Sequence, residues 1–547
     1  MTERCRVAVV GSGFAGSLVA RVLATLGHDV MLLERGTHPR FAIGESSTPL
    51  ANLSLERIGR RYGLADCYRL ATHGRWLVHH PDVRRGLKRG FTFYRHHPGE
   101  PLHGDERLLV AASPSDEIAD THWLRADVDQ HFVREAVAAG VDYRDRVELT
   151  GVDGTRLTGT RDGAPLEIDA DFVVDASGPN GFLARQLGIP SALDRVETRS
   201  ALVFSHFENV RSMPDVVPGL SAGPYADDLA AVHHVIDEGW MYALRFDHGV
   251  TSAGFLLTPG GLAALGSSAE KAPRELDSGS NGSGGSARSA IQIHGGLPDL
   301  GAQPAALWSL LLDRYPTIAA AYRDATPIRP IAFVPRVQHR LARAAGDRWV
   351  MLPHAFAFVD PLFSTGIAWG LRAVERLALC FERGLPNAAD LARYGAALDA
   401  EATQIDRLVA GAYSAMRHFD LLAAHAMVYF AVVSYSEVKQ RITERDDVAW
   451  DGFLGVGDPA AEPLPAEALR RLRALRPDDA DARGGFAEWV AEAIAPRNVA
   501  GLADPARGNH YPVDLDTLVE RHALLDMTRG EILEALPALR GMSPSPF

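Results

Sequence analysis

The sequence predicts an α/β protein with a Rossmann-like nucleotide-binding domain, an inserted domain built on an antiparallel β-sheet, and a helical C-terminal domain. Three observations carry this prediction. A β-forming run enters a glycine-rich turn and then a helix within the first 26 residues. Residues 199–340 change to alternating strands rich in aromatic side chains, and beyond residue 385 the chain is mostly alanine-rich amphipathic helix. A chain of 547 residues exceeds what one hydrophobic core supports, so several domains are expected.

The N-terminal turn has the spacing of a dinucleotide-binding motif. It reads Gly11-Ser12-Gly13-Phe14-Ala15-Gly16 after a strand, and Glu34 closes the next apolar run. Gly11 permits the tight turn, Gly13 lets the backbone approach a pyrophosphate, and Gly16 lets helix and strand pack closely. The helix N-terminus offers N–H groups to phosphate, and Glu34 can accept hydrogen bonds from ribose hydroxyls. A plain glycine turn is the alternative, but the strand, the helix and the acid together favour a nucleotide site.

Two later strands end in similar small, polar turns. One ends in Asp175-Ala176-Ser177-Gly178, and the other, at 346–352, runs into a Gly/Ser/Pro loop before a helix predicted from Ile367. Ligands of open parallel sheets bind outside the carboxyl ends of the strands, so we expect residues 175–178 near the first glycine loop, with a simple strand-end turn as the alternative. The second loop directs another helix N-terminus at a ligand. The loop at 44–49 is also rich in hydrogen-bond donors. Its alternative interpretation is a capped start of the helix predicted at 50–60.

Lys88 is one of few lysines in a chain that strongly prefers arginine. It lies at the start of residues 87–95, which alternate like a single strand entered from a basic turn. Taken alone, such a lysine is interpreted as a solvated surface charge.

Composition excludes several classes of function. The net charge of −13 argues against a general nucleic-acid binder. The sequence predicts no membrane span and no signal peptide, so we expect a cytoplasmic protein. The three cysteines are scattered, and the sequence predicts no metal site. The Gly/Ser-rich stretch at 278–286 predicts a flexible surface excursion near residues 270–290.

Three separated segments resemble the FAD-binding core of the flavin monooxygenase-like superfamily. They are the glycine turn with Glu34, residues 175–178, and residues 346–361. Within this core, residues 44–49, the lysine in Leu87-Lys88-Arg89-Gly90-Phe91, and the motif Phe358-x-x-Pro361-x-x-Ser364-x-Gly366 resemble the flavin-dependent halogenases. The similarity is to the branch that acts on phenolic, polyketide or carrier-bound aromatics, and it covers residues 5–385 and, weakly, the helical tail. It implies a Rossmann-like FAD-binding fold of the flavin monooxygenase type.

The resemblance also implies roles for individual residues. Lys88 matches the catalytic lysine of the family. Reduced FAD, O2 and a halide ion would give hypohalous acid, which the lysine holds by a hydrogen bond or as a haloamine and presents to an electron-rich ring. No second nucleotide motif is visible, so a separate flavin reductase is expected to supply reduced FAD. FAD would contact Gly11, Gly13, Phe14, Ala15, Gly16, Glu34, Arg35, Ser47, Arg125, Asp175, Gly178, Asp360, Gly366 and Ile367. Substrate and halide would contact Trp240, Tyr242, Pro361, Ser364, Thr365 and Gly366.

One motif departs from the family. Halogenases carry W-x-W-x-I-P on a strand facing the flavin, where this chain has Trp240-Met241-Tyr242-Ala243-Leu244-Arg245. That motif is thought to keep substrate away from the flavin. Three hypotheses therefore stay open: a halogenase of an aromatic natural-product intermediate, a halogenase-like flavoprotein doing halide-independent oxidation, hydroxylation or reduction, and a non-catalytic flavoprotein. Free tryptophan is disfavoured as substrate, because the glutamate of the tryptophan-specific enzymes is not evident at 352–354. The small-molecule aromatic substrate is expected either free or bound to a carrier protein.

The predicted domains are discontinuous. Residues 1–80, 100–198 and 341–385 are assigned to the FAD-binding domain. Residues 81–99 and 199–340 are assigned to the substrate-binding β-sheet domain, and residues 386–547 to the helical C-terminal domain.

Overall fold

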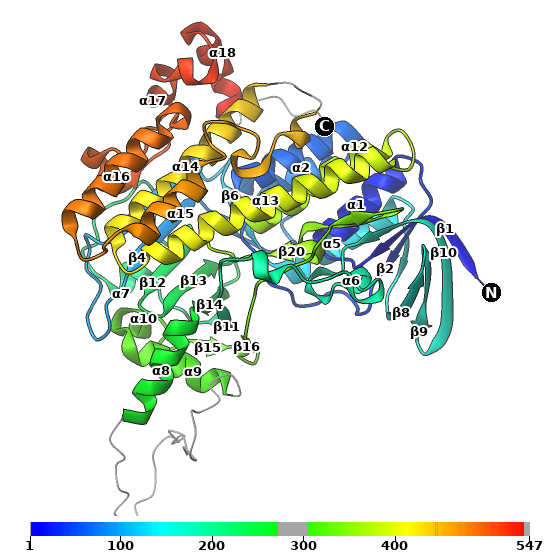
Figure 1. The fold of residues 1–547 in the computed structure, drawn as a ribbon, viewed down its shortest axis with the longest axis horizontal. Helices are drawn as coiled ribbons and strands as arrows, with labels where there is room; N and C mark the ends of the chain where they lie inside the picture. The colour runs from blue at the N-terminus through cyan, green and yellow to red at the C-terminus, as the bar shows by residue number, and fades with distance from the viewer. Residues whose placement is uncertain (1, 272–302, 444, 446, 541–547) are drawn as a thin grey trace, which may run out of the picture.

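The computed structural model describes residues 2–271, 303–443, 445 and 447–540. It shows a parallel sheet flanked by helices, a second large sheet beside it, and a layer of long helices running across both (Figure 1). The excursion predicted near residues 270–290 lies, from residue 272 onward, outside the described residues.

The first sheet has a parallel core in the order β19-β10-β1-β2-β7. Its central strands are buried on both faces, with Val7, Ala8 and Val9 at 0% exposure, as expected of a parallel sheet covered by helices. Helix α1 (Phe14–Thr25) packs against α5 (Arg125–Ala138) and α12 (Thr365–Phe381). The Rossmann-like prediction is thus confirmed. The strands are β1 (Glu3–Val10), β2 (Val30–Leu33), β7 (Asp142–Arg144), β10 (Ala164–Asp175) and β19 (Trp349–Met351), with β8 (Val147–Asp153), β9 (Arg156–Arg161) and β18 (Ala345–Gly346) added antiparallel at its margins.

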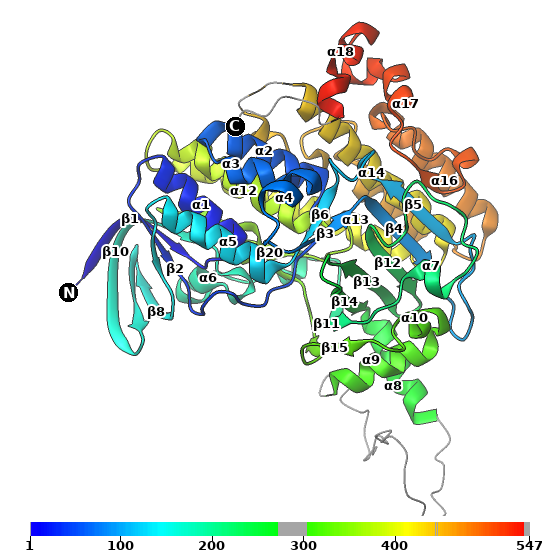
Figure 2. The ribbon, with the colours of Figure 1, turned by 180° about the vertical axis from the view of Figure 1, so that it is seen from behind.

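The second sheet is mostly antiparallel, in the order β15-β11-β14-β13-β12-β4-β5-β21, and β16 also pairs with β11. Two of its pairs, β4 with β12 and β5 with β21, are parallel. Helices α9 (Pro304–Arg314) and α10 (Pro316–Ala321) cover one face through Trp308 and its neighbours (Figure 2). The strands are β4 (Gly90–Arg95), β5 (Arg107–Ala111), β11 (Ala201–Glu208), β12 (Ala231–Ile236), β13 (Gly239–Arg245), β14 (Thr251–Leu257), β15 (Thr326–Pro327), β16 (Ala332–Val334) and β21 (His510–Tyr511).

The single strand predicted at 87–95 is wrong. The chain forms two strands in different sheets: β3 (Arg85–Lys88) pairs with β6 (Asp120–Trp123), while β4 joins the large sheet. The break falls at Arg89, and a Cβ on Gly90 would lie 2.2 Å from the Val110 carbonyl oxygen, so only glycine lets β4 begin against β5 there. Two strands of the large sheet also lie outside the segments predicted for the substrate-binding domain. β5 lies in the segment assigned to the FAD domain and β21 in the segment assigned to the helical domain, yet both extend the large sheet.

The C-terminal region is helical as predicted, and its longest helices lie across both sheets (Figure 1). A buried ion pair ties it to the nucleotide domain, because Arg376 of α12 donates to Glu401 of α13 at 2.5 and 2.8 Å. Among the described residues, α14 is the one helix long and apolar enough to cross a membrane, but 67% of its most apolar window is buried by packing against the rest of the protein. The region contains α13 (Ala388–Ala415), α14 (Phe419–Ile442), α15 (Leu464–Ala474), α16 (Ala480–Ile494), α17 (Leu515–Glu520) and α18 (Arg529–Leu539).

The remaining short elements connect these layers. They are α2 (Pro49–Tyr62), α3 (Ala65–Leu70), α4 (His73–His79), α6 (Phe182–Gln186), α7 (Met213–Val216), α8 (Pro259–Lys271), α11 (Pro353–Phe356), β17 (His339–Arg340) and β20 (Ala357–Phe358). The helix predicted at 50–60 is confirmed as α2.

Candidate active site

The glycine turn between β1 and α1 is shaped by close backbone contacts. Gly11 has a φ of +102°, and a Cβ there would lie 2.4 Å from the Ala176 carbonyl oxygen. A Cβ on Gly16 would lie 2.0 Å from the Gly11 carbonyl oxygen. Gly13 is different, because the nearest atom to its added Cβ is 3.6 Å away. Two of the glycines therefore serve packing, and the third leaves open space at the helix N-terminus, as an approaching pyrophosphate requires.

Glu34 lies beside this turn at the end of β2 and is 8% exposed. Its carboxylate accepts hydrogen bonds from the Ser12 amide at 3.1 Å and the Ser12 hydroxyl at 2.8 Å, and pairs with Arg40 at 3.4 Å. Burial acts to raise the pKa of Glu34, but Arg40 and these hydrogen bonds outweigh it and lower the pKa. The acid is thus ionised at the predicted place, while Arg35 beside it is exposed. Arg40 was missed by the sequence analysis.

Arg125, in the first turn of α5, joins three parts of the site. It makes two bonds of 2.9 Å to Asp129 and donates to the carbonyl oxygen of Gly44 at 3.1 Å. Its guanidinium lies 4.8 Å from the centroid of the Phe14 ring, and the Phe14 amide donates to Asp129 at 3.1 Å. Asp129, which sequence reasoning missed, fixes both the arginine and the start of α1. This places a cation directly beside the open side of Gly13.

Asp175 and Ser47, two residues predicted to contact FAD, form hydrogen bonds within the protein. Asp175 is 0% exposed and accepts from the amides of Ser177 and Leu183 at 2.9 and 2.7 Å, which shapes the turn that carries Gly178. Ser47 accepts from the Thr121 amide at 3.1 Å. Direct contacts of Asp175 and Ser47 with FAD stay predictions.

The loop from Phe358 to Gly366 is anchored to both the large sheet and α14. The Leu362 carbonyl oxygen lies 2.8 Å from Nε2 of His233 on β12, and the Phe363 carbonyl oxygen accepts from the Tyr429 hydroxyl at 2.9 Å. Ser364 takes a φ of +52° and its hydroxyl donates to that of Ser46 at 3.1 Å. Pro361 is half-buried, and Thr365, Gly366 and Ile367 form the first turn of α12. The N-terminus of α12 is thereby fixed at the edge of the parallel sheet.

Asp360 is 2% exposed and is held by residues that the sequence analysis did not identify. It accepts from the hydroxyls of Ser200 and Tyr413 at 3.0 and 2.9 Å, and burial raises its pKa to about 7. Trp240 donates to the same Tyr413 hydroxyl at 3.0 Å and is fully buried, with Tyr242 beside it at 6.3 Å between ring centroids. Trp240 therefore connects to the loop through a tyrosine of the helical domain.

His354 is a further polar side chain that the sequence analysis left unassigned. Its Nε2 is buried and has no hydrogen-bond partner among the described residues. A Cβ on Gly366 would lie 3.0 Å from this nitrogen, so glycine is needed for their close approach. Burial and then the charge of Arg125 lower the pKa of His354 to about 3, which keeps the ring neutral. The open side of Gly13, the arginine beside it and this unsatisfied nitrogen fit a bound FAD at this edge of the sheet.

The structure contradicts the interpretation of Lys88 as a solvated surface charge. It is 0% exposed instead of solvated. Its Nζ donates to the Ser47 carbonyl oxygen at 2.5 Å and lies 4.0 Å from the centroid of the Phe91 ring. Asp120 faces it in the register of β3 and β6. Burial lowers the pKa of Lys88, and the charge of Asp120 opposes this effect.

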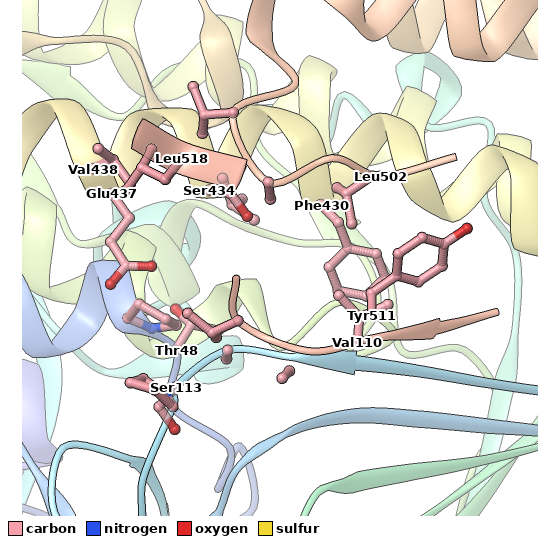
Figure 3. A pocket seen from close by; sticks show the side chains of 18 of the residues that line it. Thr48, Val110, Ser113, Phe430, Ser434, Glu437, Val438, Leu502, Tyr511 and Leu518 are labelled. Carbon is pink, nitrogen blue, oxygen red and sulfur yellow. The ribbon is translucent and has the colours of Figure 1, made fainter. Parts of the chain in front are cut away.

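A cavity of about 120 Å³ lies near Lys88, and Figure 3 shows part of its lining. Phe91 and Asp120, both neighbours of the lysine, line it. The predicted substrate and halide residues do not line this cavity, and their contacts with substrate and halide stay predictions: Trp240, Tyr242, Pro361, Ser364, Thr365 and Gly366. Two adjacent serines connect the loop at 358–366 with Lys88. Ser46 bonds Ser364, and the carbonyl oxygen of Ser47 accepts from Lys88.

The roof of the cavity comes from the helical domain. Side chains of α14 and of residues 499–518 close it, and β21 brings Tyr511 beside Val110 of the large sheet. Figure 3 shows Phe430, Tyr511 and Leu502 gathered at one end of this space. The helical tail thus encloses a pocket next to Lys88, a role that the sequence alone did not define.

The Lys88–Asp120 pair gives a direct test of the electrostatics. Asp120→Asn removes the negative charge that opposes burial, so the pKa of Lys88 should fall further. The chain has only three lysines, so ¹³C-lysine NMR titration can resolve Lys88 from Lys271 and Lys439. We expect Lys88 to titrate below the other two in the wild type, and lower still in the variant. A Lys88 midpoint equal to theirs would contradict the buried placement.

Comparison with known proteins agrees with this geometry. A family model described as tryptophan halogenase matches residues 122–421, and a model described as FAD binding domain matches residues 4–219. Tetracycline 7-halogenase of Kitasatospora aureofaciens is 29% identical over 367 residues, which cover 66% of this chain and 60% of that protein. Monodechloroaminopyrrolnitrin halogenase PrnC of Pseudomonas fluorescens is 26% identical over 373 residues, covering 66% and 58%. The chain thus aligns with less than two thirds of the length of these relatives.

Solved structures confirm the fold class. Halogenase PltM superimposes with a TM-score of 0.76 at 23% identity, covering 92% of this chain and 99% of that one. Its complex with phloroglucinol and FAD gives a TM-score of 0.68 at 23% identity and covers 98% of both chains. The halogenase model alone spans more than half of the sequence, including the loop at 358–366. The chain therefore belongs to the family of flavin-dependent halogenases described by the tryptophan halogenase model.

Proposed function

We propose that this protein is an FAD-dependent halogenase of an electron-rich, phenol-like aromatic compound. The observation that carries the proposal is Lys88, which is fully buried and donates to Ser47. Its neighbours Phe91 and Asp120 line a cavity with aromatic walls. The halogenase names of the relatives support the same activity, and favour it over the halide-independent alternative that the altered tryptophan motif left open.

FAD would be held by the glycine turn, Glu34 and Arg125, and in its reduced form with O2 it would supply the oxidising equivalent that converts a halide ion to hypohalous acid. The protein's own part begins at Lys88. Its ammonium can donate a hydrogen bond to hypohalous acid, or its neutral amine can take the halogen from that acid, breaking the O–halogen bond and releasing water as the N–halogen bond forms. Because burial lowers the pKa of Lys88, the neutral amine is more accessible than in an exposed lysine. Exclusion of water around the buried nitrogen protects the reactive halogen from loss to solvent.

The cavity indicates the size and character of the substrate. Its volume of about 120 Å³ is close to the ~150 Å³ of an engineered protein cavity that binds benzene, so it suits one aromatic ring. Phe91, Tyr429, Phe430 and Tyr511 supply aromatic walls. The complex of PltM with phloroglucinol, a single phenolic ring, supports a substrate of this class. A substrate presented on a carrier protein is compatible only if its aromatic ring enters this space.

We propose a separate flavin reductase as the source of reduced FAD, and the cytoplasm as the location where both act. The sequence has one G-x-G-x-x-G motif, at residues 11–16, which the FAD site uses. Robust oxidation of NADPH by the purified protein alone would contradict the need for a reductase.

The test supplies purified protein with FAD, a flavin reductase, NADH, O2 and bromide, and offers phloroglucinol as the aromatic acceptor. Brominated product, quantified by mass spectrometry and absent when bromide is omitted, is expected. Hydroxylated or otherwise oxidised product at the same rate with and without bromide would overturn the proposal in favour of halide-independent chemistry.

A further inference from the structure

Glu437 is an acidic side chain aimed into a mostly apolar cavity. It projects from α14, and Figure 3 shows its carboxylate directed toward the part of the cavity wall that carries Thr48 and Ser113. Its Oε1 accepts from Nε of Arg441, one turn further along the helix, at 2.9 Å. Among the described residues the bond from Arg441 to Oε1 is the one hydrogen bond found for this carboxylate, so Oε2 has none, and 20% of the side chain is exposed. One carboxylate oxygen is therefore held by the protein and the other is available to a ligand.

The surroundings make this oxygen costly to leave unsatisfied. Phe430, Val438 and Leu518 line the same space. Burial raises the pKa of Glu437, and Arg441 opposes the rise. An accessible but unpaired carboxylate in an apolar pocket gains most from a ligand that donates a hydrogen bond.

The charges around the cavity define which donor fits. Arg441 is shared, because it also lies 3.9 Å from Glu56, which pairs with Arg75 as well. Asp120 adds a second carboxylate, and its Oδ2 is buried without a partner. Lys88 faces Asp120 across the pairing of β3 with β6. With more carboxylates than unshared cations, the pocket disfavours an anionic substrate and favours a neutral one that carries hydroxyl donors.

We propose that Glu437 determines substrate specificity by accepting a hydrogen bond from a hydroxyl group on the substrate ring. The inference rests on the proposed function and names its substrate class: neutral phenols with a free hydroxyl, rather than their methyl ethers or aromatic carboxylates. The contact holds the ring between Phe91 and the aromatic side chains of the roof, next to Lys88. A hydrogen bond to a carboxylate also increases electron density in a phenol ring, which favours attack on an electrophilic halogen.

The experiment measures binding without chemistry. Oxidised holoenzyme, in the absence of reductase and halide, is titrated by calorimetry with phloroglucinol and with its trimethyl ether. Glu437→Gln keeps the size and the bond from Arg441 but turns the free oxygen into a donor. We expect it to bind phloroglucinol roughly 10- to 100-fold more weakly than wild type, as for loss of a hydrogen bond to a charged acceptor. The preference for phloroglucinol over the ether should shrink with it. Glu488→Gln, an exposed glutamate on α16, is the matched control and should bind as wild type does.

Phloroglucinol binding within twofold of wild type in Glu437→Gln, or an equal loss in the control, would overturn the inference. Glu437→Asp keeps the charge but withdraws the acceptor, and should give an intermediate loss if the glutamine variant does not fold. Failure of the two proposals can be told apart. Glu437-dependent binding without bromination in the turnover assay would defeat only the proposed halogenation, whereas bromination with unchanged binding in the variants would defeat only the role of Glu437.

Discussion

Lys88→Ala should lose halogenation while FAD stays bound. The substitution removes the buried ammonium that donates to Ser47 and lies beside Phe91 and Asp120 of the cavity lining, so nothing remains to hold or deliver the oxidised halogen. A positioned proton-donating side chain commonly contributes ~10²–10⁴ in rate, and we expect a loss of at least roughly 100-fold in brominated product. The measurement is product yield by mass spectrometry under single-turnover supply of reduced FAD, with bound flavin determined separately by fluorescence.

Two further variants define the result. Lys88→Arg keeps a positive charge, but the guanidinium is larger, is always protonated and cannot offer a neutral amine, so it should fail nearly as completely. Lys439→Ala, on α14 and outside the cavity lining, should brominate as wild type does. Full bromination by Lys88→Ala would show that free hypohalous acid performs the reaction and that the buried lysine has a structural role.

The sequence predicted those parts of the site that a short motif encodes. The glycine turn and Glu34 lie where local spacing placed them, because a strand, a turn and a helix in succession determine their own geometry. Arg125 was assigned by the family resemblance, and its contact with FAD stays a prediction. Asp129 and Arg40 lie within the same local units, and an acid one helical turn after Arg125 was the signal that could have identified Asp129.

The residues around the cavity were not predictable in that way. Glu437 and Tyr413 come from helices of the C-terminal domain and meet the site only through tertiary packing. Tyr413 is 53 residues away from Asp360 in sequence, and Glu437 is several hundred residues away from Lys88. Lys88 itself gives no local signal of burial, because the break at Arg89 that moves β3 out of the large sheet depends on the contact between Gly90 and Val110. The alternating pattern of 87–95 is compatible with one strand or two. Two strands form because β3 pairs with β6 and β4 pairs with β5 and β12.

Substitutions in the glycine turn should have the second large effect. Alanine at Gly16 and alanine at Gly13 should be harmful for different reasons. Gly16→Ala places a Cβ 2.0 Å from the Gly11 carbonyl oxygen and 2.8 Å from Cβ of Ala176, so helix α1 must move away from the sheet. Overpacking of this kind costs about 3 kcal/mol or more, and we expect the thermal midpoint of the apo protein to fall by roughly 3 °C or more. FAD binding should be lost with the fold.

Gly13→Ala is the matched comparison, since its Cβ would make only ordinary contacts, 3.6 Å from Nη2 of Arg125 and 3.9 Å from Oδ2 of Asp129. The apo protein should therefore unfold at the wild-type temperature, while the added methyl occupies the space through which a pyrophosphate approaches the backbone. We expect FAD affinity, measured by flavin fluorescence, to fall at least about tenfold. If both variants unfold early, Gly13 serves packing as Gly16 does. If Gly13→Ala binds FAD as tightly as wild type, the cofactor lies farther from this turn than the open space beside Gly13 indicates.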